Sequence, residues 1–564
     1  MDKPAVRQAL DEIARFLELK GANPFRVRAY ENAARAVMAF PGDLAEGFRS
    51  GELARVRGLG KATLEVVTEM LTTGRASTLD ELREEIPPGL VEMMRIPGLG
   101  VTKIRQIHDT LGIDSLAELD AAAADGRLAT LPRFGAKTAE NIRRGIAFLG
   151  RSTEFRLYHH AAAEARTVQE SLAALEGVAR VEIAGSLRRR RELIRDLDFV
   201  VLHRDPGARD AIARRLRSTP GVMESSGAGG AVTLRFTSGT VVDVFLTPAR
   251  AFGSTWLRAT GAAAHLAQLD ARARERSVSL ESGAYAEESD VYRALELPWI
   301  PPELREGTGE IDAAARGRLP RLVEESDLKG FLHCHSNYSD GTTTVAEWAG
   351  ACGRAGYAWM GLTDHGPAAF AGGLKAEDVP RQHEEIDAVN RTSSSFVVLK
   401  GVEADILADG RLDYGAPTLD RFDFVIASIH TRFGMSETQM TERVLTAMDD
   451  PHLTILGHPT GRLLLSRDPY QIDLEQVLRK AADRGIAVEV NADPHRLDLD
   501  WRRVREARDL GVTVSIGADA HSVAGMANVT VGVGVARKGW LEPANVLNTR
   551  DADQFRAFAR SRRS

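Results

Sequence analysis

The amino-acid sequence predicts a multidomain protein in which three architectures follow one another: an all-α N-terminal region, an α+β middle region and a C-terminal α/β barrel. Three observations lead to this prediction. Residues 1–150 carry apolar positions at helical spacing without a convincing strand, residues 151–318 mix strands and helices, and the last part repeats an apolar run and a helix seven times. The length of 564 residues suits three or four domains.

Three similar glycine-containing junctions interrupt the predicted N-terminal helices, at residues 56–61, 96–101 and 131–137. Glycines let the chain turn sharply and present backbone N–H groups at a helix N-terminus, where a phosphate is a suitable partner. A turn between packed helices explains one such junction, but three nearly identical copies favour contact with a DNA backbone. The predicted DNA-binding residues are Gly58, Gly60, Gly98, Gly100, Gly135 and Lys137.

Carboxylates mark the predicted strands of the middle region. Asp196 and Asp198 stand two positions apart in one strand, so both point to the same face, and a later strand carries Asp243. Three carboxylates on one sheet face repel each other unless cations lie between them. Two Mg²⁺ or Mn²⁺ ions relieve this repulsion, activate an attacking oxygen and stabilise a leaving pyrophosphate.

Seven short apolar runs separated by helical stretches predict a parallel α/β barrel. The runs are 330–335, 358–365, 396–403, 424–430, 453–458, 487–491 and 514–521. A single histidine in a strand is more often a core residue than a ligand, but six at successive strand ends, together with acids, indicate a divalent-metal site. The polar residues at these ends are His333, His335, Asp340, Asp364, His365, Glu403, His430, His458, Asp519 and His521.

Composition and charge exclude several classes of protein. The 43% hydrophobic and 27% charged residues are typical of soluble globular proteins, and neither a bilayer-spanning run nor a signal-like start is found. Cys334 and Cys352 cannot form a disulfide framework, so a cytoplasmic location is expected. The net charge of −6 divides into 0, +1 and −7 over residues 1–150, 151–318 and 319–564. The acid excess thus accompanies the predicted metal site.

Residues 151 to about 300 resemble the nucleotidyltransferase palm and thumb of family X DNA polymerases. The resemblance rests on Gly185-Ser186, the arginines that follow, Asp196 and Asp198 in one strand and Asp243 in a later one. It implies that the three aspartates are catalytic and hold two Mg²⁺ or Mn²⁺ ions. The nucleotide-binding residues that it implies are Gly185, Ser186, Arg189, Thr260 and Gly261.

Residues 328–545 resemble the PHP (polymerase and histidinol phosphatase) domain in four motifs: His333-Cys334-His335, Thr363-Asp364-His365, Gly401-Val402-Glu403 and Asp519-Ala520-His521. The resemblance implies a phosphoesterase site with three divalent ions, Zn²⁺ and/or Mn²⁺. Its implied ligand sets are His333, His335, Glu403 and Asp519 for one ion; Glu403, His430 and His458 for the second; and Asp340, His365 and His521 for the third.

Taken over the whole chain, the sequence resembles bacterial family X DNA polymerases with a C-terminal PHP domain. We therefore expect a DNA repair enzyme, acting in base excision repair, that fills short gaps and carries a 3′–5′ exonuclease site. Its expected partners are gapped or primer-template DNA and deoxynucleoside triphosphates, without a membrane, and its expected state is a monomer. The expected domains are an N-terminal helical domain with the first hairpin (1–80), a fingers-like domain with two hairpins (81–150), palm (151–250), thumb and linker (251–318) and PHP domain (319–564).

Departures from the family pattern leave two alternatives open. Arg190 and Arg195 stand where glycine is common, and Ala262-Ala263-Ala264 follows Thr260-Gly261. Residues 1–300 are therefore also consistent with a DNA-binding platform that no longer polymerises and delivers substrate to the barrel. A third interpretation makes the barrel a small-molecule phosphatase, against which the predicted DNA-binding hairpins argue.

Overall fold

The computed structural model describes residues 3–40, 44–56, 58–96, 98–280, 284–369, 372–393 and 395–563. Arg57 and Pro97, which belong to two of the predicted junctions, lie outside the described residues. The chain separates into two compact units, Met1–Glu154 and Phe155–Ser564. Among the described helices, none combines the length and apolar character needed to cross a bilayer.

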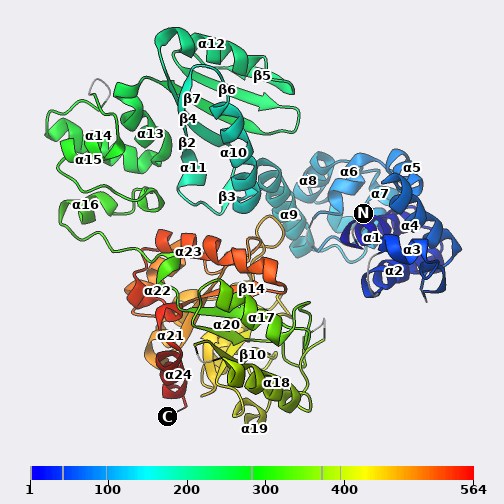
Figure 1. The fold of residues 1–564 in the computed structure, drawn as a ribbon. Coiled ribbons are helices and arrows are strands. Elements are labelled where there is room, and N and C mark those ends of the chain that lie inside the picture. Colours follow the sequence, from blue (N-terminus) through cyan, green and yellow to red (C-terminus); the bar gives the residue numbers. More distant parts are fainter. Residues whose placement is uncertain are drawn as a thin grey trace. The chain divides into compact units, whose positions relative to one another are not determined.

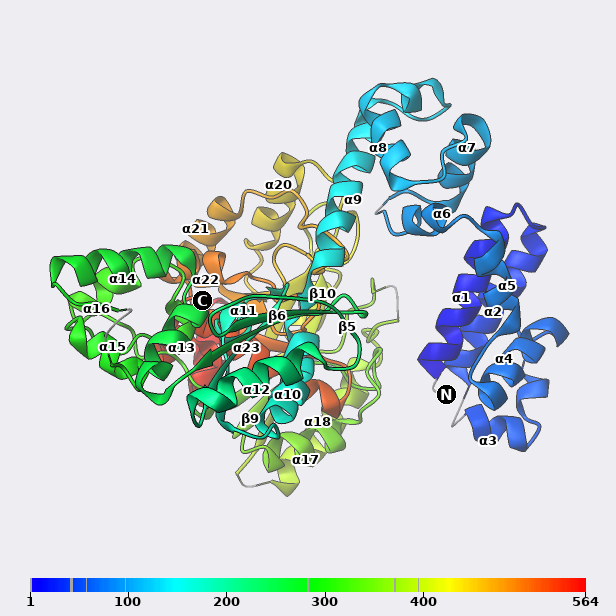
Figure 2. The same cartoon turned by 90° about the horizontal axis from the view of Figure 1, so that it is seen from above.

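The N-terminal unit is helical throughout its described residues (Figures 1 and 2). Val6, Leu10 and Ile13 repeat at helical spacing and are fully buried in its core. The helices are α1 (Lys3–Leu19), α2 (Pro24–Ala39), α3 (Leu44–Arg49), η1 (Leu53–Arg55), α4 (Lys61–Thr73), α5 (Ser77–Glu85), α6 (Pro88–Met93), α7 (Val101–Leu111), α8 (Leu116–Ala124), η2 (Arg127–Thr130) and α9 (Ala136–Glu154).

The second unit begins with a five-stranded sheet of order β2-β4-β7-β6-β5, in which β4 and β7 are parallel and the other pairs antiparallel. Leu197, Phe199 and Val201 of β4 pack with residues of α10 and α12, whereas the alternate Val200 packs with Phe252. Asp198 shares the face of Val200 because strand side chains alternate. The elements are β1 (Arg156–Leu157), α10 (Tyr158–Ala173), β2 (Val178–Ile183), α11 (Gly185–Arg188), β3 (Leu193–Ile194), β4 (Leu197–His203), α12 (Pro206–Arg217), β5 (Val222–Ser226), β6 (Ala231–Phe236) and β7 (Val241–Thr247).

A group of helices with its own apolar core follows the sheet (Figure 2). Its elements are η3 (Ala249–Ala251), α13 (Phe252–Thr260), α14 (Ala263–Glu275), α15 (Glu288–Ala294), η4 (Pro302–Leu304) and α16 (Glu310–Ala315). The proline, glycine and charge of residues 300–328 are typical of a linker, yet residues 300–314 are largely packed, and Arg305 and Glu310 among them are fully buried. Arg305 forms an ion pair with Glu288 of α15, and Glu310 forms a hydrogen bond with His265 of α14 at 2.6 Å. This pairing explains how a polar segment becomes part of a core.

The last part forms the predicted seven-stranded parallel barrel, closed in the order β10-β11-β12-β13-β14-β8-β9 (Figure 1). The strands are β8 (Gly330–Cys334), β9 (Trp359–Leu362), β10 (Val397–Asp405), β11 (Phe424–Ser428), β12 (Leu453–Leu456), β13 (Ala487–Asn491) and β14 (Val514–Ala520). The helices are η5 (Glu325–Asp327), α17 (Val345–Arg354), α18 (Val379–Thr392), α19 (Ala416–Leu419), α20 (Glu437–Ala447), α21 (Leu474–Arg484), α22 (Trp501–Asp509), η6 (Val523–Ala527), α23 (Asn528–Lys538), η7 (Pro543–Asn545), η8 (Leu547–Thr549) and α24 (Ala552–Ser561). Phe555 of α24 packs with Trp359 and Phe424 of the barrel strands.

Candidate functional site

Three carboxylates gather at one edge of the five-stranded sheet. Asp198 on β4 and Asp243 on β7 are register partners on adjacent parallel strands, and Asp196 immediately precedes β4. Thr233 Oγ1 on β6 donates a hydrogen bond to Asp243 at 2.5 Å. Burial, reinforced by the charges of Asp196 and Asp243, raises the pKa of Asp198 to about 7. The sheet thus brings together the predicted triad at a position where cations relieve its repulsion.

A glycine allows the candidate nucleotide-binding turn to approach this triad. Gly185 begins α11 with a φ of +62°, and a Cβ atom on it would lie 1.7 Å from Asp198 Oδ2. Any side chain at this position would therefore displace the carboxylate or the turn. Ser186 follows in the same turn and is half-buried.

The arginines of this turn reach the residues predicted to complete the nucleotide site. Arg188 Nη1 donates to the hydroxyl of Thr260 at 2.8 Å, and Arg189 Nη1 donates to its carbonyl at 2.6 Å. Thr260 is fully buried at the end of α13, and Gly261 caps that helix. Arg189 also pairs with Glu306 at 3.0 Å, a contact that the sequence did not suggest.

The backbone conformation at Arg190 explains why glycine is common at this position in the family pattern. Its φ of +56° is left-handed, a conformation that costs residues other than glycine about 1–2 kcal/mol. Its side chain leaves the turn and crosses α23, where Nη1 donates to the Thr530 carbonyl at 3.3 Å. A Cβ on Gly534 would lie 2.7 Å from Arg190 Cδ, so that helix position needs glycine for this contact. This departure thus concerns domain packing rather than the aspartate triad.

The second cluster lies at the C-terminal ends of the barrel strands, where the sequence predicted it. Ligand atoms lie within 4.8 Å of one another in three groups: His335, Asp340, His365 and His521; His333, His335 and Asp519; His365, Glu403 and His430. His458 Nε2 lies 3.0 Å from Glu403 Oε1. All nine predicted ligands therefore converge, although His335 and His365 each join two groups, whereas the expected sets gave each of them one ion.

Several polar atoms of this cluster suit metal ions because they are buried without a hydrogen bond. Within the described residues these atoms are His333 Nε2, His335 Nδ1 and Nε2, His365 Nδ1, Glu403 Oε2 and His458 Nδ1. Burying unpaired polar atoms is costly. Imidazole and carboxylate groups are the usual ligands of Zn²⁺ and Mn²⁺, so the donor set fits divalent cations.

Strained backbone accompanies the cluster. His333, His458 and Asp519 have φ angles of +60°, +23° and +48°, in a region that side-chain-bearing residues rarely occupy. Such strain persists where surrounding packing imposes it, and it concentrates at functional sites. Cys334, between two of the ligands, packs into the apolar core, because successive strand side chains alternate faces.

Two carboxylates outside the predicted ligand set orient the histidines. Glu489 on β13 lies 2.5 Å from His333 Nδ1, and Asp405 on β10 lies 2.9 Å from His430 Nδ1. Such contacts fix the ring orientation and direct the opposite nitrogen toward the cluster. For Asp405, which stands two positions after the predicted ligand Glu403 in the same strand, strand alternation was the available signal.

The three junctions of the N-terminal unit begin helices as predicted. Gly60, Gly100 and Gly135 immediately precede α4, α7 and α9, and a Cβ atom on any of them would meet no heavy atom within 4 Å. Gly58 and Gly98 adopt left-handed φ angles of +106° and +79°. Arg133 takes the same place in the third junction with a φ of +69°. The three turns therefore share a positive φ at this position, and their open glycines leave room for a phosphate against the backbone.

Lys137, the other predicted DNA contact, lies exposed in the first turn of α9.

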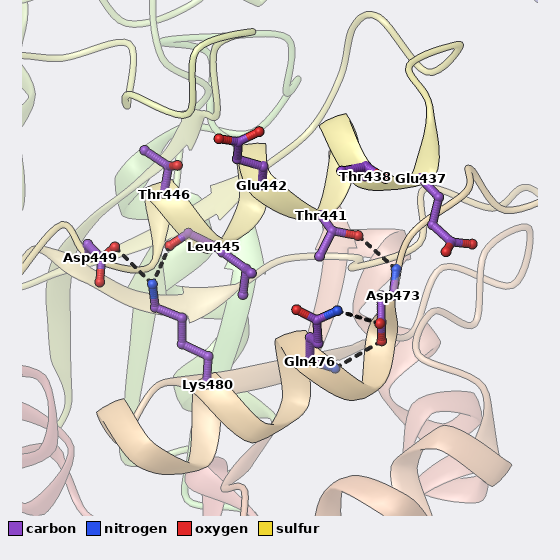
Figure 3. A pocket seen from close by; sticks show the side chains of 10 residues that line it. All are labelled: Glu437, Thr438, Thr441, Glu442, Leu445, Thr446, Asp449, Asp473, Gln476 and Lys480. Carbon is purple, nitrogen blue, oxygen red and sulfur yellow. Dashed lines mark hydrogen bonds and ion pairs between the residues drawn. The ribbon is translucent and has the colours of Figure 1, made fainter.

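A cavity of about 330 Å³ lies on the surface of the barrel (Figure 3). It lies between α20 and α21, and several of its polar groups bond with each other: Lys480 pairs with Asp449 at 2.8 Å, and Thr441 Oγ1 accepts from the Asp473 backbone at 2.9 Å. None of the predicted site residues lines it. We therefore do not regard it as a candidate site.

Family models match four parts of the chain. A helix-hairpin-helix domain matches residues 1–76, a SAM-like helix-hairpin-helix tandem residues 90–147, a DNA polymerase beta thumb residues 255–306 and a PHP domain residues 332–493. Together with the aspartate triad and the histidine-lined barrel, they define the class of family X DNA polymerases that carry a C-terminal PHP domain.

A relative of full length makes the assignment more specific. The chain is 36% identical over 570 aligned residues to the DNA polymerase/3′-5′ exonuclease PolX of Bacillus subtilis strain 168, with 99% of each chain covered. It belongs to the family of that protein. Probable phosphatases of Syntrophotalea carbinolica and Caldanaerobacter subterraneus are 32% and 31% identical to 28% and 31% of the chain, which covers 64% and 65% of their lengths.

Proposed function

We propose that the protein is a DNA polymerase with a 3′–5′ exonuclease: the sheet carries nucleotidyl transfer and the barrel hydrolyses phosphodiesters. The observation that carries the polymerase part is the pairing of Asp198 with Asp243 on adjacent parallel strands, next to a glycine turn that ends in arginines. The full-length similarity to a protein named for both activities supports the assignment. Its substrates are DNA and deoxynucleoside triphosphates, and gapped or primer-template DNA in a repair setting is the specific form that we propose.

At the sheet, we assign the metal-holding role to Asp196, Asp198 and Asp243. Thr233 fixes the orientation of Asp243, while Gly185 keeps the turn close to Asp198. We assign triphosphate binding to Gly185, Ser186 and Arg189, with Thr260 and Gly261 closing the pocket. Divalent ions, here Mg²⁺ or Mn²⁺, supply charge neutralisation and lower the pKa of an attacking hydroxyl when bound.

At the barrel, we assign metal binding to the nine converging residues, with Zn²⁺ and/or Mn²⁺ as the ions. Glu489 and Asp405 accept hydrogen bonds from His333 and His430, and so keep the other ring nitrogens directed at the site. Arg496 lies 3.3 Å from Asp519 and adds positive charge beside the cluster. The site thus concentrates groups that hold cations and attract a phosphodiester.

The helical hairpins provide the DNA contact in this proposal. Open turns at Gly60, Gly100 and Gly135 place backbone N–H groups where phosphates bind, which positions DNA without reading its sequence. The domain limits at residues 80, 150, 250 and 318 belong to the same proposal, as do a monomeric state and a cytoplasmic location.

Primer extension on a gapped duplex tests the polymerase assignment against the non-polymerising platform. With Mn²⁺ and single nucleotides, incorporation should follow the template base and disappear in an Asp196→Ala, Asp198→Ala double variant. The absence of any incorporation would favour the platform. A phosphatase acting on small molecules would instead hydrolyse a phosphomonoester with a rate indifferent to DNA, whereas we expect DNA ends to compete.

A further inference from the structure

A buried cluster of charges connects the candidate nucleotide-binding turn with the barrel. Its centre is Glu306, in the segment between η4 and α16, with only 7% of its side chain exposed. The Glu306 carboxylate lies 3.0 Å from Arg189 Nε, 2.5 Å from Lys538 Nζ and 3.4 Å from Arg191 Nη1. Two of these cations belong to the turn, while Lys538 ends helix α23 of the barrel.

Lys538 is fully buried in this cluster. Its side chain has no exposed surface, and Nζ also donates to the carbonyl of Arg189 at 2.9 Å and to that of Glu303 at 3.3 Å. Burial lowers the pKa of Lys538 to about 8, a shift that the neighbouring Glu306 carboxylate opposes. A buried ammonium is costly unless it is paired, so the position of Lys538 depends on Glu306.

The guanidinium of Arg189 has little freedom in this arrangement. Nε faces Glu306, Nη1 donates to the Thr260 carbonyl at 2.6 Å, and 13% of the side chain is exposed. A triphosphate that binds Arg189 must compete with the Glu306 carboxylate for the same guanidinium group. Lys538 shares that carboxylate and reduces the charge that holds Arg189 back.

We propose that Glu306 competes with the incoming nucleoside triphosphate for Arg189, and that Lys538 of the barrel is a positioning residue that sets the strength of this competition. The inference rests on the proposed nucleotidyl-transfer function and deepens it, because it makes nucleotide affinity depend on a residue of the exonuclease domain. Arg190 joins the same turn to the same helix through Thr530 and Gly534, so the turn is held on α23 at two points.

Single-nucleotide gap filling by the full-length protein tests the proposal through the KM for the deoxynucleoside triphosphate. Lys538→Met should raise KM by about tenfold with little change in kcat, because Glu306 then acts on Arg189 without the competing ammonium. Glu306→Gln should lower KM. The double variant should recover a KM close to that of Glu306→Gln, because the carboxylate that restrains Arg189 is gone.

Arg537→Met is the matched control. Arg537 is the neighbour of Lys538 on α23 and pairs with Glu303 at 2.7 Å across the same interface, without contacting Arg189 or Glu306. Its KM should stay that of the wild type. Exonuclease activity and thermal unfolding, measured on the same preparations, detect a folding defect in Lys538→Met. Should that variant misfold, Glu306→Gln decides the question, because only competition predicts a lower KM.

The proposal is overturned if Glu306→Gln raises KM, or if the KM of the double variant is higher than that of Lys538→Met. It is also overturned if Arg537→Met raises KM as much as Lys538→Met does. A wild-type protein without any incorporation overturns the proposed function, and the inference with it. Where the wild type incorporates nucleotides and Arg189→Ala raises KM, the function stands and the Lys538 and Glu306 variants test the inference alone.

Discussion

Asp198 and Asp243 face each other as register partners on adjacent parallel strands, so two carboxylates meet at the sheet edge. Asp196 adds a third charge, and burial together with these neighbours raises the pKa of Asp198 to about 7. The metal-free protein therefore carries an electrostatic cost that divalent cations remove. The activity and the stability of this region should respond oppositely to the loss of one charge.

Replacing Asp198 by Asn should reduce nucleotide incorporation by about 10²–10³-fold or more, the loss seen when a group that stabilises developing charge is removed. The same change should stabilise the metal-free protein at pH 8 by on the order of 1–2 kcal/mol, since each unit of pKa displacement corresponds to about 1.4 kcal/mol and partial exposure screens it. Urea unfolding with a chelator measures this. Asp210→Asn, on the exposed face of α12, is the control, and a destabilised Asp198→Asn would contradict the account.

The metal dependence of incorporation should change with pH near neutrality. A raised pKa means that the folded protein holds the Asp198 proton up to about pH 7, against an ordinary value of 3.8. The free-energy cost of an ionised Asp198 in the folded protein is thus absent in acid and fully present above pH 7. Below pH 7, protons compete with cations for this carboxylate. The Mn²⁺ concentration for half-maximal incorporation should rise about tenfold for each pH unit below 7. An unchanged requirement between pH 6 and 8 would exclude this linkage.

Glu489→Gln should weaken the barrel site selectively. Glu489 orients His333, and loss of such a partner typically costs about 10–100-fold in metal affinity. Exonuclease activity should therefore require more metal, while gap filling is retained. Glu475→Gln, which alters an exposed pair with Arg479 on α21, should leave both activities unchanged. Equal metal requirements in the wild type and Glu489→Gln would show that the contact has no such role.

Glu288 should be important for folding. It pairs with the fully buried Arg305 at 2.6 Å and with Arg188 at 2.6 Å. Despite burial, these arginines lower the pKa of Glu288 to about 2, so its stabilising effect is present above pH 4.5 and lost as the pH falls toward 2. Glu288→Ala should cost about 3–5 kcal/mol, because it leaves a buried guanidinium without its carboxylate.

Chemical unfolding at pH 7 measures this cost. Glu288→Ala combined with Arg305→Met should recover part of the loss, since the fully buried charge of Arg305 is then gone and only Arg188, which also donates to Thr260, lacks its carboxylate. A loss below about 1 kcal/mol for Glu288→Ala, a value typical of surface pairs, would contradict the buried-pair interpretation.

Local patterns predicted the features that depend on spacing. Alternation in β4 placed Asp196 and Asp198 together, and seven apolar runs predicted the barrel and its histidine-bearing end. Contacts between distant segments could not be predicted in this way. Lys538 meets Glu306 across 232 positions of sequence, and nothing in either neighbourhood identifies the other.

Residues 300–328 show that composition alone does not predict burial. Their proline, glycine and charge suggested a linker, yet Arg305 and Glu310 are buried because Glu288 and His265 lie opposite them. Likewise, Arg190 stands where glycine is common. Only the structure shows that its backbone keeps the left-handed φ of that position while its side chain packs on α23. Composition describes a segment, whereas the partners of its charges decide whether it is buried.

The central claim is that one chain carries two separable metal-dependent sites. A single labelled gapped duplex, incubated with divalent metal and nucleotides, reports both extension and shortening of the primer. We predict that Asp196→Ala with Asp198→Ala abolishes extension and retains shortening, and that His335→Ala abolishes shortening and retains extension. Loss of both activities from either change, in a protein that unfolds like the wild type, would contradict the account.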